Sequence, residues 1–477
     1  MSSCGCFVFE LHFRMPLSIH VDFAGVRANP VLPMPVAVLE NCAAGSLDGM
    51  TLVRFAHAFE SGGGMERLLH DLDCALLERN AMTIIRIHIA EDRAMLAERT
   101  SEIGRGRLLM VPLPLADGDS LQIAPDVEPD ALSMKERLRN RVLYHPWIWA
   151  LGLERWNLAR AIGRRSGQVV GAGAKFAELA DRFRIDLCML HFFGGSDADE
   201  IVAKARLRGI PFALQNHYSN DRFLHLSIRK HATLANGVAG VNGLDLPDYV
   251  ADRFCNLSDG IDVRFFKRSR ARLIDDAPLV PLILLPARVI RPKGHLDLVR
   301  IAACLKAKGI EFQIGFAGRV ESTGFVNELR AEIEKLGLRD DVRFLGALGV
   351  DELRDWYAAS AVVAFPTYHH EGLGRVTIEA QAMEVPVVAY ATGGVPEGVK
   401  DGATGFTVRT GDIDGMTARL ELLLTDPALR IKMGQAGRNF VESHYSFEAV
   451  AARHEDYYNR LTRVRRSAES DAAYRSR

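Results

Sequence analysis

The sequence predicts an α/β protein with two Rossmann-like, doubly wound domains that face each other across a cleft. Its length of 477 residues is too great for one ordinary core, so two domains of roughly 200 residues each are expected. Short apolar runs alternate with helical stretches, which is the pattern of parallel strands joined by helices. With 48% hydrophobic residues, 25% charged residues and a formal net charge of -1, the composition is that of a folded globular protein. It favours neither a disordered chain nor a nucleic-acid binder.

Residues 1–49 are expected to form an extension outside the fold. They contain scattered prolines and no sustained period, whereas an apolar run typical of an opening strand begins directly after Met50. Met50 is therefore a candidate for the real start of the protein. Glu10, His12 and Arg14 interrupt the apolar core that a secretory signal would need. No apolar run reaches the ~18 residues that cross a bilayer.

The seven cysteines are scattered, and apart from Cys4 and Cys6 none has the close spacing of a metal or redox motif. A reducing, cytoplasmic setting fits this usage best.

The first domain is expected over residues 50–270. Its opening pattern is a strand at 52–57, a glycine turn that ends at Gly64, a helix at 65–78 and a strand at 82–88. Further apolar strands are predicted at 185–190, 211–215 and 237–241.

The second domain is expected over residues 271–460. The charged, aperiodic stretch 268–277 is the candidate linker, because a new strand follows it. The predicted strands are 282–286, 312–317, 342–345, 362–365 and 387–390. The polar, Arg/Ser-rich tail at 461–477 is expected to be frayed or disordered.

Residues 135–165 depart from this alternation. Eight basic residues lie there against two acidic ones, together with Trp147, Trp149 and Trp156. Such a segment suits a helix on an anionic membrane surface, which predicts a peripheral protein on the inner face of the membrane. The other interpretation is a solvated helical insertion whose tryptophans pack on the domain.

The strongest functional signal is the stretch 362–394. A buried strand is followed by Glu371, by the turn Gly372-Leu373-Gly374 and by a helix that carries Glu379 in its second turn. A helix start behind glycines points bare N–H groups at whatever lies beyond the strand end, which favours a diphosphate. Carboxylates accept paired hydrogen bonds from sugar or ribose hydroxyls. Taken singly, either glutamate also fits a surface charge.

A second strand-to-helix turn carries Arg288 and Lys293. Both cations are placed to converge on a bound phosphate, Arg288 as a fork and Lys293 as a point charge, and to stabilise a departing diphosphate. Surface cations are the alternative interpretation, and Arg291 is interpreted as a surface charge.

Three positions follow strands of the first domain. The glycine run that contains Gly63 and Gly64 allows close backbone approach to a ligand, but it also fits a plain tight turn. His191 and His217 each end a strand on the side where parallel sheets bind ligands. A structural role is the alternative for both histidines.

These motifs together resemble the GT-B glycosyltransferases of family 4, also called group 1. The likeness rests on residues 359–408, on the segment from Arg288 to Gly294 and on the segment 257–262, and it covers most of residues 50–460. It implies an enzyme that binds a nucleoside diphosphate sugar in its C-terminal domain and an acceptor in its N-terminal domain, and that transfers the sugar with retention and without a metal or other cofactor.

Carried over by position, the resemblance implies that Arg288 and Lys293 hold the diphosphate and that Glu379 holds the ribose. Glu371 and the backbone of Gly372, Leu373 and Gly374 would contact the sugar. His217 would contact the donor near the reacting carbon, with Gly63 and Gly64 closing from the other side. The expected acceptor is a glycan or a lipid-linked intermediate in cell-surface polysaccharide synthesis.

The sequence departs from the family pattern at Ala287, Leu373 and Glu384. Glu384 stands where glycine commonly ends the signature helix, and a left-handed conformation there would cost about 1 kcal/mol relative to glycine. A sugar-nucleotide epimerase and a non-catalytic nucleotide-sugar-binding protein of the same fold remain alternatives. A nicotinamide dehydrogenase is less favoured, because the full GxGxxG fingerprint with its acidic residue is missing.

Overall fold

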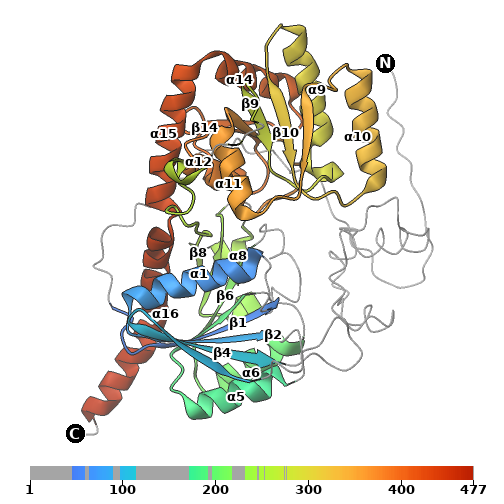
Figure 1. Ribbon diagram of the computed structural model, residues 1–477. Helices are drawn as coiled ribbons and strands as arrows, with labels where there is room; N and C mark the ends of the chain where they lie inside the picture. Colours follow the sequence, from blue (N-terminus) through green and yellow to red (C-terminus); the bar gives the residue numbers. More distant parts are fainter. Residues whose placement is uncertain are drawn as a thin grey trace, which may run out of the picture. The chain divides into compact units, whose positions relative to one another are not determined.

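The protein is described by a computed structural model over residues 46–59, 64–89, 97–113, 171–191, 196–217, 231–243, 246–251, 253–272, 274 and 277–475. Both sheets of the fold lie within one unit, residues 44–477 (Figure 1). The basic tryptophan segment 135–165 and Gly63 lie outside the described residues.

The first sheet has eight strands in the order β3-β4-β2-β1-β5-β6-β7-β8. All its neighbouring strands are parallel except the antiparallel pair β3 and β4. The strands are β1 Thr51–Phe59, β2 Thr83–Ile89, β3 Arg99–Ile103, β4 Gly106–Leu113, β5 Leu187–Leu190, β6 Phe212–Asn216, β7 Gly237–Gly240 and β8 Phe254–Asn256. Helices of this part within the described residues include α1 Gly64–Arg79, α5 Ala172–Arg182, α6 Ser196–Leu207 and α8 Asp248–Ala251.

The second sheet has six parallel strands in the order β11-β10-β9-β12-β13-β14. Its strands are β9 Leu282–Leu285, β10 Gln313–Ala317, β11 Val342–Gly346, β12 Val362–Phe365, β13 Val387–Tyr390 and β14 Gly405–Val408. Its helices are α9 His295–Ala307, α10 Thr323–Lys335, α11 Val350–Ala359, α12 Arg375–Ala382, α13 Val395–Gly398, α14 Ile413–Thr425 and α15 Pro427–His444, with short 3-10 turns at Arg268–Arg270 and Arg291–Lys293.

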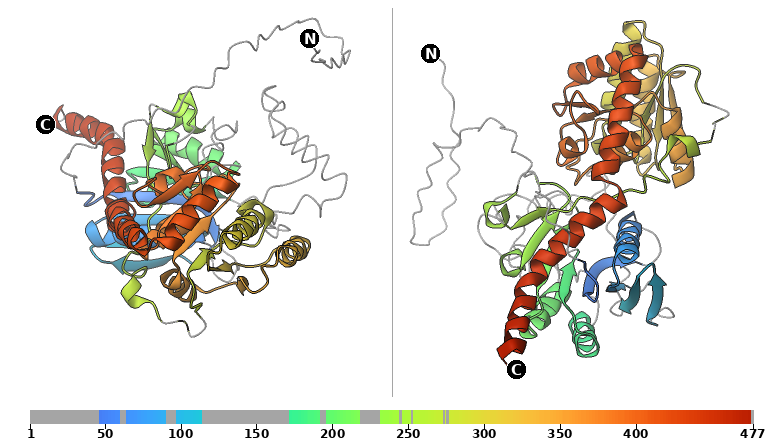
Figure 2. Two further views of the ribbon diagram at one scale, coloured as in Figure 1. Left: turned by 90° about the horizontal axis from the view of Figure 1, so that it is seen from above. Right: turned by 90° about the vertical axis from the view of Figure 1, so that its left-hand side faces the viewer.

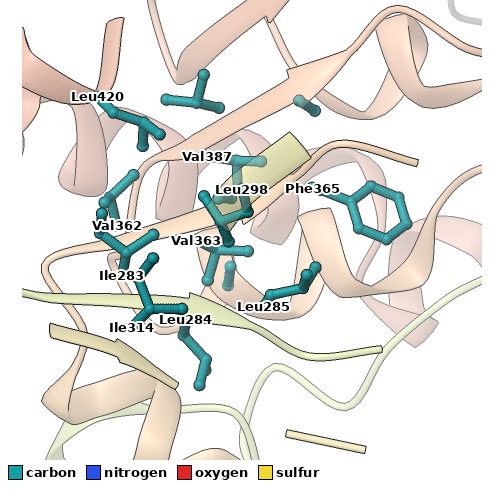
Figure 3. Close-up of a cluster of buried hydrophobic side chains, with 14 of the residues drawn as sticks. Ile283, Leu284, Leu285, Leu298, Ile314, Val362, Val363, Phe365, Val387 and Leu420 are labelled. Carbon is teal, nitrogen blue, oxygen red and sulfur yellow. The ribbon is translucent and has the colours of Figure 1, made fainter. Parts of the chain in front are cut away.

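Buried apolar strands form the centre of the second domain. The central strands β9, β12 and β13 have four buried residues each, because helices cover both faces of a parallel sheet. Figure 3 shows side chains of these strands meeting Leu298 from α9 and Leu420 from α14. The first sheet has two apolar clusters, one that includes Phe176 of α5 and one that includes Leu72 of α1. The prediction of two doubly wound α/β domains is confirmed.

The last helix, α16 Phe447–Arg475, changes the predicted domain boundaries. Val450, Tyr457 and Tyr458 of this helix are buried in the same apolar cluster as Leu72 of α1, so the chain returns to the first domain after α15. The assignment of 271–460 to the second domain is therefore wrong from α16 onward. A frayed tail from residue 461 is also wrong, because the helix continues to Arg475 (Figure 2).

The fold begins before Met50. Leu47 and Met50 are both fully buried, and the Leu47 amide donates to Asn80 Oδ1 at 3.1 Å. The Ala81 amide donates to Asp48 Oδ1 at 2.7 Å. The expectation that the extension outside the fold reaches residue 49 is therefore wrong for these residues, because polar and apolar contacts both tie them to the start of β2.

Candidate functional site

The site predicted from the sequence lies at the switch point of the second sheet. Strand order reverses between β9 and β12, so the loops that follow these two neighbouring strands diverge. In open α/β sheets the carboxyl ends of the strands at such a reversal are the usual place for a ligand. Arg288 and Lys293 follow β9, and Glu371 follows β12, so the fold brings the two predicted motifs to one edge.

The two loops are bound to each other through Gly294. This residue has a φ of +74° and ends the 3-10 turn that carries Lys293. A Cβ atom at Gly294 would lie 1.9 Å from the carbonyl oxygen of Pro366, so only glycine permits this approach. The Tyr368 amide also donates to Pro292 O at 2.8 Å. The position of Lys293 is thus fixed relative to the loop after β12.

Lys293 and Glu371 form an ion pair between these loops. Lys293 Nζ donates to Glu371 Oε1, and the side chains are only 12% and 18% exposed. Solvent and salt screen these two charges less than they screen charges on the surface, so the attraction between Lys293 and Glu371 is stronger. The structure thus places a cation and a carboxylate side by side at the switch point.

The glycine turn after Glu371 packs closely against Gly394. The Gly394 amide donates to Glu371 O at 2.9 Å, and Asn242 Nδ2 donates to Gly372 O at 2.6 Å. A Cβ at Gly394 would lie 1.8 Å from Gly372 O, which makes glycine necessary there. Gly374, with a φ of +73°, then begins α12 at Arg375. The first amides of α12 therefore point beyond the end of β12, as an anion site requires.

Leu373, in the same turn, is 3% exposed and belongs to the apolar core of the domain. Its side chain anchors the turn, and only its backbone is offered to a ligand.

Glu379 is buried rather than a surface charge of its helix. It is 9% exposed, Tyr357 donates its hydroxyl to Glu379 Oε2 at 3.0 Å, and Arg375 lies 3.5 Å from Oε1. Burial raises the pKa of Glu379 above its ordinary value, with Arg375 acting in the opposite direction. Asn242 and Tyr357 were not predicted. Asn242 lies two residues after β7 of the first sheet. A position just after a strand is the signal that singled out His217, whereas Tyr357 carries no such signal.

Arg288 pairs with an acidic residue of the loop that follows β10. Its guanidinium donates to both oxygens of Glu321, at 3.0 and 3.2 Å, and its side chain is 43% exposed. The predicted convergence of Arg288 and Lys293 on one phosphate therefore stays a prediction.

His217 lies in the first domain, where both of its ring nitrogens have partners. Nδ1 is 3.0 Å from Asp259 Oδ1, and Nε2 is 2.8 Å from Nδ1 of His191. His191 is fully buried, and burial followed by the charge of Arg54 lowers its pKa well below the ordinary value. Gly64 is the first residue of α1, which follows β1 and so lies at the switch point of the first sheet.

The described residues contain neither a candidate membrane-spanning helix nor a candidate metal-binding cluster. No helix among them is long and apolar enough to cross a membrane. No group of three or more His, Cys, Asp or Glu side chains within the described ranges is arranged to hold a metal ion.

Comparison with curated proteins gives glycosyltransferase relatives that match part of the chain. The chain is 33% identical over 215 residues to a GDP-mannose-dependent monoacylated alpha-(1-6)-phosphatidylinositol monomannoside mannosyltransferase of Corynebacterium glutamicum, covering 42% of this chain and 54% of that protein. It is 31% identical over 172 residues to the capsular polysaccharide biosynthesis glycosyltransferase CapM of Staphylococcus aureus, covering 36% and 44%. The chain thus matches about half the length of these relatives.

Solved structures match over most of the described fold. A glycosyltransferase from Rickettsia africae aligns with a TM-score of 0.60 at 17% identity, covering 87% of this chain and 98% of that one. Anabaena HepE in complex with UDP-glucose aligns with a TM-score of 0.56 at 16% identity, covering 88% and 100%. These structures have the GT-B fold, with its two Rossmann-like domains.

Residues 276–440 match the protein family described as Glycosyl transferases group 1. This range contains Arg288, Lys293, Glu371 and Glu379, together with the helix start between the two glutamates. The chain therefore carries a glycosyl transferases group 1 domain within a protein of GT-B fold.

Proposed function

We propose that this protein is a retaining glycosyltransferase that moves a sugar from a nucleoside diphosphate sugar to a hydroxyl of a glycan or lipid-linked acceptor. The observation that carries the proposal is the Lys293 to Glu371 pair at the switch point, next to the start of α12. The diphosphate and the sugar of such a donor are bound by different kinds of group. A cation and helix amides bind a diphosphate, while a carboxylate accepts hydrogen bonds from sugar hydroxyls.

The same groups supply catalysis in this proposal. Charge develops on the diphosphate as the sugar departs, and Lys293, Arg288 and the first amides of α12 stabilise it. Glu379 accepts hydrogen bonds from the ribose, and the paired Glu371 orients the sugar. Retention follows from the family resemblance: the leaving phosphate helps to deprotonate the acceptor on the face from which it departs. Rate enhancement then comes from positioning and electrostatics.

Relatives support the class of substrates. The Corynebacterium glutamicum relative is named as GDP-mannose-dependent, and HepE was solved with UDP-glucose, so nucleoside diphosphate sugars recur among similar proteins. CapM is named for capsular polysaccharide biosynthesis, which supports the proposal of a cell-surface polysaccharide. The base of the donor is identified by a donor screen.

A donor screen tests the proposal. Thermal-shift measurements with UDP, GDP, ADP and their sugars should show one nucleotide that raises the melting temperature, and the matching sugar should then release free nucleotide in the presence of acceptor. Isomerisation of the sugar without nucleotide release would support an epimerase instead. If no nucleoside diphosphate or its sugar stabilised the protein, the proposal would fail.

Peripheral membrane contact through residues 135–165 is proposed from the sequence alone, because basic residues and tryptophans interleave there. Co-sedimentation with anionic and with neutral liposomes tests it. Binding that requires anionic lipid supports the contact, and a lack of binding to both kinds of liposome rejects it.

A further inference from the structure

Four buried polar side chains of the first domain form one hydrogen-bonded chain. Arg54 Nη1 lies 3.1 Å from His191 Nε2, His191 Nδ1 lies 2.8 Å from His217 Nε2, and His217 Nδ1 lies 3.0 Å from Asp259 Oδ1. Arg54 and His191 are 0% exposed, His217 is 7% and Asp259 is 8%. The chain links β1 to the loops that follow β5, β6 and β8.

The chemistry of its two ends fixes every proton in this chain. A guanidinium only donates, so His191 Nε2 has to accept and the single proton of a neutral ring lies on Nδ1. That proton is donated to His217 Nε2, which leaves the proton of His217 on Nδ1. An ionised carboxylate only accepts, and Asp259 Oδ1 receives that last proton. A proton on His217 Nε2 would set two donors against each other at His191.

Arg54 is itself held by two other elements. Its Nε lies 2.8 Å from Asp73 Oδ1 in α1, and Asp73 Oδ2 also accepts from Arg86 Nε at 3.0 Å. Arg54 Nη2 donates to the hydroxyl of Tyr458 in α16 at 2.9 Å. The guanidinium is therefore fixed by α1 on one side and by the returning C-terminal helix on the other.

We propose that Arg54 and His191 are positioning residues for glycosyl transfer, which hold the His217 ring in a single neutral tautomer with its proton on Nδ1. Because Arg54 also donates to the Tyr458 hydroxyl, the position of its guanidinium depends on α16 as well. The proposal rests on the proposed function, because His217 matters for transfer only if the donor binds between the domains. In this arrangement the imidazole of His217 is a fixed part of the wall of the site, and it neither takes up nor releases a proton during transfer.

The position of the chain favours such a role over a purely structural one. His191 and His217 follow β5 and β6, on the edge of the first sheet where ligands bind. A buried polar chain costs desolvation that an apolar core would avoid, and it restricts the geometry of every member. Misplacing a group in an active site by about 1 Å can cost about 100-fold in rate.

The tautomer can be measured without any activity assay. Protein labelled with 15N-histidine is examined by long-range 1H–15N NMR near neutral pH, and the signals are assigned with His191→Gln and His217→Gln. The proposal predicts that both rings are neutral, with the proton on Nδ1 and a bare Nε2. Finding His217 with its proton on Nε2, or as an imidazolium, would overturn it.

Variants then connect the tautomer to transfer. His191→Phe removes both hydrogen bonds at similar volume, so the His217 signals should show mixed tautomers and kcat should fall by up to about 100-fold with little change in KM for the donor. His191→Gln keeps one acceptor and one donor and should restore most of kcat. His454→Phe is the matched control, since His454 is also 0% exposed but bonds to Gln215 and to Val450 O.

Three results separate the possibilities. Wild-type kcat together with an unchanged His217 tautomer in His191→Phe would overturn the proposal. Equal losses of kcat in His191→Phe and His454→Phe would show a general effect of core damage and would also overturn it. A wild-type protein that shows the predicted tautomers but binds no nucleotide would reject the proposed function alone.

Discussion

Glu379 is a carboxylate that the fold buries beside Tyr357, and its pKa is raised above the ordinary value because burial disfavours the charge. The folded protein then binds a proton at Glu379 more tightly than the unfolded chain does. This contribution to the free energy of unfolding is present at low pH and is lost as pH rises through the raised pKa. The charge is retained, in this account, because it binds ribose.

The substitution Glu379→Gln should therefore have opposite effects on stability and binding. Relative to wild type, its free energy of unfolding should increase as pH rises from about 4 to about 7, because no charge is buried. Nucleotide affinity should fall by about tenfold through loss of a charged acceptor. Urea unfolding at a series of pH values measures the first effect. A stability difference that does not depend on pH would contradict it.

Glu384 is the single residue other than glycine with a positive φ among the described residues, at 59°. The cost expected from the family pattern depended on a left-handed conformation here, and the structure has that conformation. Glu384→Gly should raise the free energy of unfolding by about 1 kcal/mol without changing turnover. The same change at Glu328, inside α10, should lower it by about 1 kcal/mol. A loss of stability in both variants would be inconsistent with this account of Glu384.

The residue pairs of the site were less predictable than the residues. Arg288 pairs with Glu321, and Glu379 accepts from Tyr357, which is 22 positions away. Nothing local in the sequence marks these partners, because they come together only when different strands and helices pack. The sequence therefore predicted which residues lie at the strand ends but not what holds them there.

Among the elements, the turn that carries Lys293 depends on Gly294. Gly294 and Gly309 both have a φ of +74°, but a Cβ at Gly294 would meet Pro366 O at 1.9 Å, whereas a Cβ at Gly309 would meet nothing within 4 Å. Gly309→Ala should cost about 1 kcal/mol from backbone strain alone. Gly294→Ala should cost more and should also weaken nucleotide binding. Urea unfolding and nucleotide titration of both variants measure this, and equal losses would contradict a role for close approach.

Strand burial explains some of the strands that were predicted or missed, although β4, which is mostly buried, and β14 were not predicted either. The predicted strands β9, β12 and β13 are continuous apolar runs, because both of their faces are covered. β3 was missed because its residues Arg99–Ile103 are mostly exposed and polar, and β8 because it is only three residues long. Edge strands such as these are specified by their neighbours more than by their own composition.

At the scale of the whole molecule, α16 packs back against the first domain. Glu455 accepts from Arg79 at 2.6 and 2.9 Å and from Asn80 at 2.8 Å, and Tyr458 is fully buried against the first sheet. The sequence did not predict that α16 packs on the first domain. Tyr458 and Arg54 are 404 positions apart, and nothing in the sequence of the helix indicates this contact.

Ending the chain after Ser446 should therefore unfold the first domain, because it exposes the apolar cluster that includes Leu72 and Met50. A chain that ends after Arg463 keeps Tyr458 and should stay folded. Circular dichroism and the sharpness of thermal unfolding compare the two. Cooperative, wild-type-like melting of the shorter chain would show that α16 is dispensable for the first domain.

The proposed binding site of the nucleoside diphosphate is the switch point of the second sheet, against Lys293 and the start of α12. Titration calorimetry with the nucleotide found in the donor screen tests it most directly on wild type, Lys293→Ala and Arg291→Ala. Arg291 is the matched control, since it lies in the same 3-10 turn but is 53% exposed and pairs with Glu328. Lys293→Ala should lower the affinity for the nucleotide by about tenfold or more, while Arg291→Ala should bind like wild type. Equal affinity of wild type and Lys293→Ala would contradict it.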